Sequence, residues 1–185
     1  LADLPVGEGG ASKRVVMQAP KNGFFYVLDA ATGKFVSGNN YVPQNWTTGL
    51  DENGRPIENP DARYSDVPFL QTPGPLGGHN WHPTAFNPDT GLVYIPAMET
   101  FGIYAEAQKT LKFEKNWWNT GMQWDKYQAA IDEAVASGEL AYNHGVIKAW
   151  DPVKQEEVWR VDLSDHWNGG ILTTAGNLVF QGTGD

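Results

Sequence analysis

Three segments of this chain share one pattern, in which a short run of strand-forming residues ends at Asp or Asn and continues into a turn. They cover residues 27–33, 85–91 and 149–155. The Asp or Asn side chain at the strand end can accept a hydrogen bond from the backbone two residues on, and Gly33 and Gly91 can adopt the positive φ that closes a turn. A repeated strand–turn–strand unit is typical of a propeller or a solenoid. The irregular spacing of the three segments favours propeller blades separated by long loops.

The residues around these turns predict eight short strands of about five residues each. The predicted ranges are 14–18, 23–28, 83–86, 92–96, 145–150, 157–161, 170–174 and 177–181. One convincing helix is expected, over residues 126–137, where apolar residues recur on one face between Asp125 as the N-cap and Gly138 beyond the last turn. The predicted fold class is therefore all-β with one helical insertion.

Two insertions interrupt the strand pattern. Residues 38–79 are rich in Asn, Pro, Asp and Gly, which predicts a long loop over one face of the sheets. Residues 97–144 contain the predicted helix, which is expected to cover the rim of the blades. An aromatic cluster in the same insertion is either a small satellite core or a wall of a substrate or partner pocket. Its members are Phe113, Trp117, Trp118, Met122 and Trp124.

Composition excludes several classes of function. The formal net charge is −9 and Lys and Arg are scattered singly, so no basic stripe is available to bind nucleic acid. The chain has no Cys, which rules out disulfides, thiolate metal ligands, Cys nucleophiles and covalently attached haem within these residues. No run approaches the ~20 apolar residues of a membrane span. The first residues contain no Met and no leader pattern, so the chain is expected to be cut from a longer protein.

Lys21 lies between Pro20 and Gly23, immediately before the strongly β-forming run of residues 24–28. Because Pro and Gly favour turns, Lys21 is expected on a short, tight turn at a strand end. A cation fixed by a rigid scaffold is suited to polarising an electron-accepting carbonyl. A loop lysine can equally be a solvated surface charge.

A second chemically suggestive segment covers residues 77–83. Its two glycines allow a close approach of the backbone, and Asn80 beside Trp81 offers an amide next to a flat indole, which suits a planar polar ligand. His79 and His82 are three residues apart, but no third or fourth ligand follows at a suitable spacing, so a metal site is not predicted.

A third segment, residues 165–170, again places an aromatic residue, the amide of Asn168 and two glycines at the entry to a strand. Taken alone, each of these segments would be an ordinary loop of a β protein. Their combination is what makes a binding site plausible.

Together these segments resemble the signatures of the pyrroloquinoline quinone (PQQ)-dependent alcohol dehydrogenases, the quinoproteins and quinohaemoproteins that oxidise alcohols in the periplasm. Residues 18–29, 77–83 and 167–183 carry the resemblance in the family's order, and it extends over essentially all of residues 1–185. It implies one partial domain, about three four-stranded antiparallel blades of an eight-bladed β-propeller, with insertions at about 38–79 and 97–144.

The resemblance also implies a tryptophan-docking motif that locks neighbouring blades. Ala149, Asp151 and Trp159 keep the form of that motif. The other two turns depart from it, because Ser37 follows Asp29 where Trp would stand and Ile95 follows Asn87 at the same place.

By the same resemblance, Lys21, Asn80, Trp81 and Asn168 are expected to contact PQQ. Lys21 matches the lysine beside the quinone oxygens, where its charge would stabilise negative charge on the carbonyl, so its expected catalytic role is electrostatic and not that of the base. Asn80 and Trp81 match an Asn-Trp pair at the edge of the cofactor. No metal ligand is expected within the chain.

The resemblance places other parts of the enzyme outside these residues. The Asp base and the Ca²⁺ ligands would precede Leu1, and any haem c would belong to a further domain beyond Asp185. The implied activity is oxidation of primary alcohols to aldehydes by hydride transfer to PQQ, with a cytochrome c as electron acceptor and the remaining blades as partners. The segment alone is expected to be inactive. The alternatives are a non-catalytic β-propeller binding module and a carbohydrate-binding β domain that uses exposed Trp faces.

Overall fold

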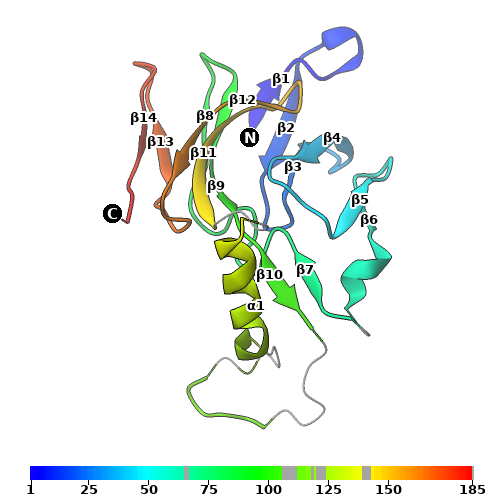
Figure 1. The fold of residues 1–185 in the computed structure, drawn as a ribbon. Helices are drawn as coiled ribbons and strands as arrows, with labels where there is room; N and C mark the ends of the chain where they lie inside the picture. The colour runs from blue at the N-terminus through cyan, green and yellow to red at the C-terminus, as the bar shows by residue number, and fades with distance from the viewer. Residues whose placement is uncertain (65–66, 106–111, 118, 120–123, 139–142, 185) are drawn as a thin grey trace.

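The chain is seen here as a computed structural model that describes residues 1–64, 67–105, 112–117, 119, 124–138 and 143–184. Strands dominate it, together with one α-helix and two short 3₁₀ turns (Figure 1). The first sheet is a four-stranded antiparallel meander in the order β1 (Ala2–Leu4), β2 (Lys13–Gln18), β3 (Phe24–Asp29) and β4 (Phe35–Asn40). The turn η1 (Glu8–Gly10) lies between β1 and β2.

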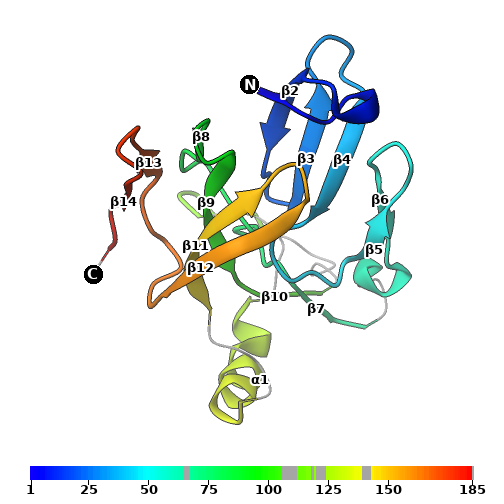
Figure 2. The same ribbon diagram turned by 90° about the horizontal axis from the view of Figure 1, so that it is seen from above.

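The second sheet is also four-stranded and antiparallel. It contains β8 (Ala85–Asn87), β9 (Leu92–Glu99), β11 (His144–Asp151) and β12 (Glu156–Leu163), in that spatial order. The last strands, β13 (Ile171–Thr173) and β14 (Val179–Gln181), form a two-stranded sheet beside it (Figure 2). The prediction of adjacent four-stranded antiparallel sheets is therefore confirmed for two sheets. All eight strands predicted from the sequence are present, with their ends shifted by at most three residues, whereas β1 and β4 were not predicted.

The sequence prediction for residues 38–79 was wrong in one respect, because this segment is not a loop throughout. It contains a hairpin of β5 (Thr47–Leu50) and β6 (Pro56–Glu58), the turn η2 (Pro60–Arg63) and β7 (Phe69–Gln71). The partner of β7 is β10 (Gly102–Tyr104), about 30 residues further along the chain. Three- and four-residue strands are too short to show a period of two in the sequence. The pairing of β7 with the distant β10 also leaves no pattern in the sequence near either strand.

The predicted helix is present as α1 (Trp124–Ala136). It begins two residues earlier than expected, so Asp125 stands inside the first turn of the helix and is not its N-cap. Gly138 follows its end with a φ of +78°, as a helix-terminating glycine does. Among the described residues, no helix is long and apolar enough to span a membrane.

The two four-stranded sheets pack face to face on a common apolar core. Phe25 and Val27 of β3 meet Ile95 of β9 and Trp150 of β11, all of them buried. The rings of Phe25 and Trp150 lie 5.9 Å apart. Burial of one such side chain contributes roughly 1.5–3 kcal/mol, so this contact fixes the two sheets against each other.

Polar contacts complete the interface between these sheets. Ser37 Oγ accepts a hydrogen bond from Gln155 Nε2 at 3.1 Å, and the carbonyl of Gln155 accepts one from Asn39 Nδ2 at 3.1 Å. Ser37 therefore joins the sheets through a side-chain hydrogen bond at the position where the docking motif has Trp.

The Trp of the one turn that keeps the motif packs within the second sheet. Trp159 on β12 lies opposite the fully buried Ala149, and the centroid of its ring lies 5.7 Å from that of Tyr94.

A buried lysine ties three strands of the second sheet together. Lys148 on β11 has 5% of its side chain exposed, and its Nζ lies 2.8 Å from Glu99 of β9 and 2.9 Å from Glu157 of β12. Burial acts to raise the pKa of Glu99, but hydrogen bonds from Lys148 and Arg160 outweigh it and lower that pKa. The charge of Lys148 is thus paired where an unpaired charge would be costly.

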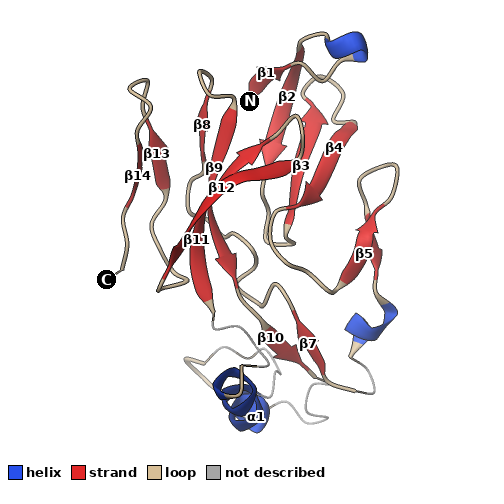
Figure 3. Ribbon diagram, turned by 45° about the horizontal axis from the view of Figure 1, so that its top comes forward, coloured by secondary structure: helices blue, strands red, loops and turns tan. Residues whose placement is uncertain are grey.

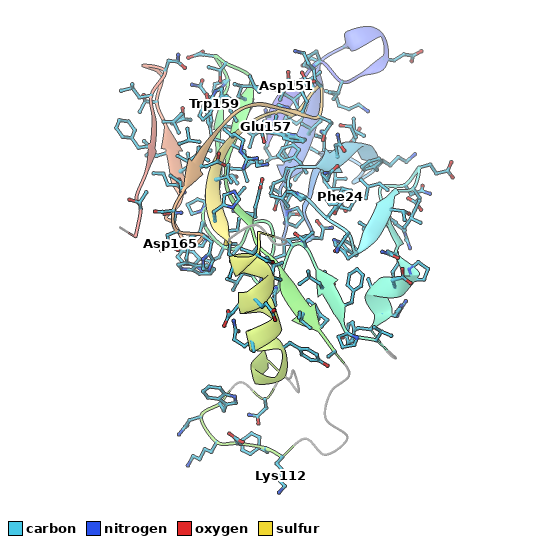
Figure 4. All side chains as sticks on the ribbon, viewed as in Figure 1. Phe24, Lys112, Asp151, Glu157, Trp159 and Asp165 are labelled. Atoms are coloured by element: carbon cyan, nitrogen blue, oxygen red, sulfur yellow. The ribbon has the colours of Figure 1, made fainter. Side chains whose placement is uncertain are left out.

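The meanders have two different ends. Because successive strands are antiparallel, the β3–β4, β8–β9 and β11–β12 turns lie at one end of their sheets, here called the turn end. The β2–β3 turn and the connections β4–β8, β9–β11 and β12–β13 lie at the other, here called the site end. Figure 3 shows β7, β10 and α1 beyond the sheets at the site end. Figure 4 shows Asp151 and Asp165 at opposite ends of the second sheet.

Candidate functional site

The turn that carries Lys21 is held in place by its neighbours. The Gly23 N–H donates to the Pro20 carbonyl, and Gly23 has a φ of +91°. The Tyr41 hydroxyl donates to the same Pro20 carbonyl at 2.8 Å, and the Trp46 indole donates to the Asn22 carbonyl at 3.0 Å. Burial raises the pKa of Tyr41 well above its usual range, so its hydroxyl remains a donor. The predicted tight turn at a strand end is confirmed.

Lys21 itself is exposed at this turn. Among the residues that the structure describes, Lys21 has no ion-pair partner, as is also true of Lys34, whereas Lys13, Lys148 and Lys154 are paired with carboxylates. A cation on a fixed backbone and without a carboxylate is available to an anionic or strongly polar ligand.

The segment that contains Gly77 and Gly78 packs directly against the Lys21 turn. The Gly78 N–H donates to the Lys21 carbonyl at 3.0 Å, and the Gly78 carbonyl accepts from the Met98 N–H at 2.8 Å. A Cβ on Gly77 would lie 2.7 Å from Lys21 Cα, closer than real Cβ contacts. The close backbone approach predicted for these glycines is thus a contact with the Lys21 turn.

His79 has a structural role in this segment. Its Nδ1 lies 2.7 Å from the Ala19 carbonyl and its Nε2 lies 2.5 Å from the His82 carbonyl. Because both ring nitrogens face carbonyl oxygens, neither is free to bind a metal. The described residues contain no group of three or more His, Cys, Asp or Glu that could hold a metal ion.

Trp81 forms an aromatic ledge on the surface, together with His82 and Trp167. The Trp81 ring is stacked on His82 with centroids 4.3 Å apart, and Trp167 meets both rings edge to face. Trp81 is nevertheless 72% exposed, while His82 is buried beneath it. Burial lowers the pKa of His82, as does the nearby His79, so the ring under the ledge is neutral at pH 7. A flat, exposed indole on a rigid base is suited to contact a planar ligand.

Asn80 uses half of its hydrogen-bonding capacity to shape its own loop. Its Nδ2 donates to the Leu76 carbonyl at 3.0 Å, and its Oδ1 accepts from the Trp81 N–H at 2.9 Å. One N–H and one lone pair of the amide remain available to a ligand.

Asn168 lies deeper than Asn80. It is 8% exposed, its Nδ2 donates to the Asp165 carbonyl, and its buried Oδ1 has no hydrogen-bond partner among the described residues. Its segment is fastened to the Trp81 segment, because the Ile171 N–H donates to the Pro83 carbonyl at 2.9 Å.

The structure therefore joins the three segments that the sequence singled out. Lys21 contacts residues 77–78, and Trp81 contacts Trp167 of the third segment. Sequence reasoning missed Tyr41 and Trp46, which fix the turn, because they lie in a segment that was predicted as a loop. It included Trp167 in the third motif without giving it a role, although the recurrence of Trp beside Asn was the available signal.

The aromatic cluster of the 97–144 insertion falls partly outside the described residues, which include neither Trp118 nor Met122. Phe113 and Trp117 are 80% and 71% exposed, so these two do not form the expected satellite core. Lys112, which precedes Phe113 in the chain, lies on the far side of α1 from the sheets (Figure 4).

Stacked antiparallel sheets, with Lys21, Asn80 and the Trp81 ledge on the connections at their site end, define a mostly β protein. No family model matches the chain. The chain is 46% identical over 183 residues to the dehydrogenase subunit of a quinone alcohol dehydrogenase of Komagataeibacter europaeus. It is 46% identical over 184 residues to a quinohemoprotein alcohol dehydrogenase of Pseudomonas putida. The alignments cover 97% and 99% of the chain but 24% and 25% of these relatives.

Solved structures give the same result. The chain superposes on a quinohemoprotein alcohol dehydrogenase from Comamonas testosteroni with a TM-score of 0.81 and 40% identity, covering all of this chain and 27% of that one. A europium-containing methanol dehydrogenase gives a TM-score of 0.71 at 27% identity, covering 97% of this chain and 30% of that one. The resemblance seen in the sequence is confirmed: the chain is a homologue of the PQQ-dependent alcohol dehydrogenases and spans about a quarter of their length.

Proposed function

We propose that this chain is part of a PQQ-dependent alcohol dehydrogenase and supplies one side of its quinone site. The observation that carries the proposal is the packing of the Lys21 turn against Gly77 and Gly78, which puts Lys21 and the following Asn80–Trp81 loop at the site end of a chain similar to quinone-dependent alcohol dehydrogenases. In the complete enzyme these sheets would be blades of an eight-bladed propeller.

The residues at the site end fit the chemistry of PQQ, which is planar, carries carboxylates and has adjacent carbonyl groups. Lys21 offers an ammonium without a carboxylate partner among the described residues, and Trp81 offers an exposed flat ring on the buried His82. Asn80 retains one donor and one acceptor, whereas the Oδ1 of Asn168 is buried and has no hydrogen-bond partner among the described residues. These are the groups expected to hold such a cofactor.

When bound, PQQ supplies a carbonyl carbon that accepts a hydride from the alcohol. Lys21 would stand beside the carbonyl oxygen and stabilise the negative charge that develops there. Its turn is held by Tyr41 and Trp46, so the ammonium is positioned before the reaction and little reorganisation is needed. Trp81 and Trp167 would exclude water from one edge of the ring.

Other parts of the reaction belong to the rest of the proposed enzyme. The base that takes the alcohol proton and the Ca²⁺ ligands would lie in the blades that complete the propeller, and a cytochrome c would accept the electrons. The name of one relative, 1-butanol dehydrogenase (cytochrome c), supports such an acceptor. A periplasmic location is part of the proposal and follows only from the family resemblance seen in the sequence. Apolar side chains exposed on β12 and β14, among them Val158, Val161 and Phe180, provide surface for further blades to cover.

A PQQ titration of the complete protein, prepared without cofactor, tests this proposal. We expect saturable binding at one equivalent and alcohol-dependent reduction of a dye only after loading. Trp81→Ala should weaken PQQ binding, while Phe113→Ala, an equally exposed aromatic residue of the insertion, should leave it unchanged. A complete protein that binds no PQQ would instead be a binding module, and the proposal would fail.

A further inference from the structure

Among the glycines that the structure describes, Gly77 alone is placed so that an added methyl group would meet Lys21. Its φ is +85°, and a Cβ built there would lie 2.7 Å from Cα, Cβ and Cγ of Lys21. Other left-handed glycines of the chain differ in this respect: Gly33 and Gly91, each with a φ of +71°, have open space where a Cβ would point. Gly77 is therefore required for packing against Lys21 as well as for its own backbone conformation.

The segment of Gly77 cannot easily move away from Lys21. The Gly77 N–H donates to the Gly74 carbonyl at 2.9 Å, and the Gly74 N–H donates to the Thr100 carbonyl at 3.0 Å. On the other side, the Met98 N–H donates to Gly78. The segment is thus anchored at two points to β9 and the residues that follow it.

The Lys21 turn is equally restrained from the opposite side. Tyr41 holds the Pro20 carbonyl and Trp46 holds the Asn22 carbonyl, so the residues on both sides of Lys21 are fixed. A methyl group at position 77 would have to be accommodated by displacing Lys21 itself, because the atoms that it meets include backbone as well as side chain.

We propose that Gly77 is a positioning residue for Lys21, and that the glycine segment sets where the Lys21 ammonium stands relative to the ledge of Trp81. The inference rests on the proposed function for its catalytic consequence, but its geometric part concerns only this chain. A misplacement of about 1 Å in a catalytic group can cost on the order of 10²-fold in rate. Gly77→Ala should therefore lower kcat by roughly 10- to 100-fold.

The first test needs no cofactor. In the complete protein without PQQ, lysines are converted to ¹³C-dimethyl-lysine, and the Lys21 signal is assigned by its loss in Lys21→Arg. We expect Gly77→Ala to shift this signal, while Gly91→Ala, which introduces the same left-handed strain in open space, leaves it in place. An unchanged Lys21 signal in folded Gly77→Ala would overturn the proposal.

The second test is a double-mutant cycle in the PQQ-loaded enzyme. If Gly77 acts through Lys21, Gly77→Ala should lower kcat in the wild-type background and have no further effect in Lys21→Ala. An equal loss in both backgrounds would show that Gly77 acts elsewhere and would contradict the proposal. Should Lys21→Ala leave kcat unchanged while Gly77→Ala still shifts the Lys21 signal, the proposed function would fail and the positional inference would stand.

A second variant covers the case in which Gly77→Ala does not fold. Tyr41→Phe removes only the hydroxyl that holds the Pro20 carbonyl, and it should also shift the Lys21 signal and lower kcat by about 3- to 10-fold, less than the loss expected of a full displacement. Its effect too should vanish in Lys21→Ala. If Tyr41→Phe moves neither readout, the Lys21 turn is not positioned by its neighbours and the proposal is wrong.

Discussion

The two ends of the sheets are built in different ways. At the turn end, each turn is closed by residues within a few positions of one another: Asp29 Oδ1 accepts from the N–H groups of Ala31 and Thr32, and Asp151 Oδ1 accepts from those of Val153 and Lys154. At the site end, the contacts join distant segments, as His79 does with Ala19, 60 residues away.

The turn end is thus shaped mainly by contacts between residues close in sequence, and the site end by contacts between distant segments. The turns repeat because the same side-chain chemistry closes each of them, and a change to that chemistry should stay local. Gln155 is an exception at this end, because it also bonds Ser37 and Asn39 of the other sheet. The site-end segments do not repeat, and each is held by its neighbours, so a change in one should be felt in the others. The predictions below test that contrast in order of decreasing effect.

The largest effect is expected from Lys21→Ala in the complete, PQQ-loaded enzyme. Loss of one preorganised charge should cost about 2–4 kcal/mol of transition-state stabilisation, or roughly 10²- to 10³-fold in kcat, with a smaller effect on PQQ binding. Lys21→Arg should recover only part of this, because the guanidinium is planar and bulkier. Steady-state kinetics at saturating alcohol measures the change in kcat. A kcat within about twofold of wild type, which corresponds to only ~0.4 kcal/mol, would show that Lys21 is an ordinary surface lysine.

The next effect compares a glycine from each end. A Cβ on Gly145, at the site end, would lie 2.4 Å from the Asp165 carbonyl oxygen and 2.5 Å from Asn168 Nδ2. Gly145→Ala should therefore lower the free energy of unfolding by about 2–3 kcal/mol through overpacking. Gly91→Ala, at the turn end, should cost about 1 kcal/mol from left-handed strain alone. Denaturant unfolding of both variants measures the difference, and equal losses would remove the contrast between the ends.

A smaller, pH-dependent effect is expected at His82. Its pKa is lowered in the folded state by burial and by His79, so the unfolded chain binds the proton more readily. Stability should then decline as the pH falls below about 6.5, the ordinary histidine pKa, and level off below the lowered pKa. His82→Gln should flatten this part of the profile. A wild-type profile that is already flat between pH 7 and 5 would contradict the assignment.

The smallest effect is expected at the turn end. The hydrogen bond from Lys13, followed by those from the Thr32 and Ala31 N–H groups, lowers the pKa of Asp29 to about 2. Its contribution should be present above about pH 4 and lost as the pH falls towards 2. A ¹³C titration of the carboxyl measures the pKa directly. Asp29→Asn keeps the turn acceptor and should leave kcat unchanged; a fall in kcat would show that the turn end communicates with the site.

Much of the turn end could be predicted from the sequence, because its signals are local. Asp29, Asn87 and Asp151 predicted their turns, and the runs beside them predicted all four strands of the second sheet but only β2 and β3 of the first, because β1 and β4 were missed. The short strands β5, β6, β7 and β10 could not be predicted, since they depend on pairing rather than on periodicity.

The site was predictable in its parts but not in its assembly. Lys21 and Asn80 stood out by residue type and by resemblance to a family. The contact between Gly77 and Lys21 joins segments more than 50 residues apart, so the sequence does not show it. The stacking of Trp81 on the buried His82 depends on the conformation of their loop, which the sequence does not show either. Lys148 gave no sequence signal of its burial, because its partners Glu99 and Glu157 come from two other strands.

The most direct test of the account is a crystal structure of the complete enzyme with PQQ bound. The account predicts that Lys21 Nζ lies within about 3 Å of a quinone carbonyl oxygen, a hydrogen-bond distance, and that Asn80 and Trp81 contact the same ring system. PQQ bound elsewhere, with Lys21 still exposed to solvent, would contradict it.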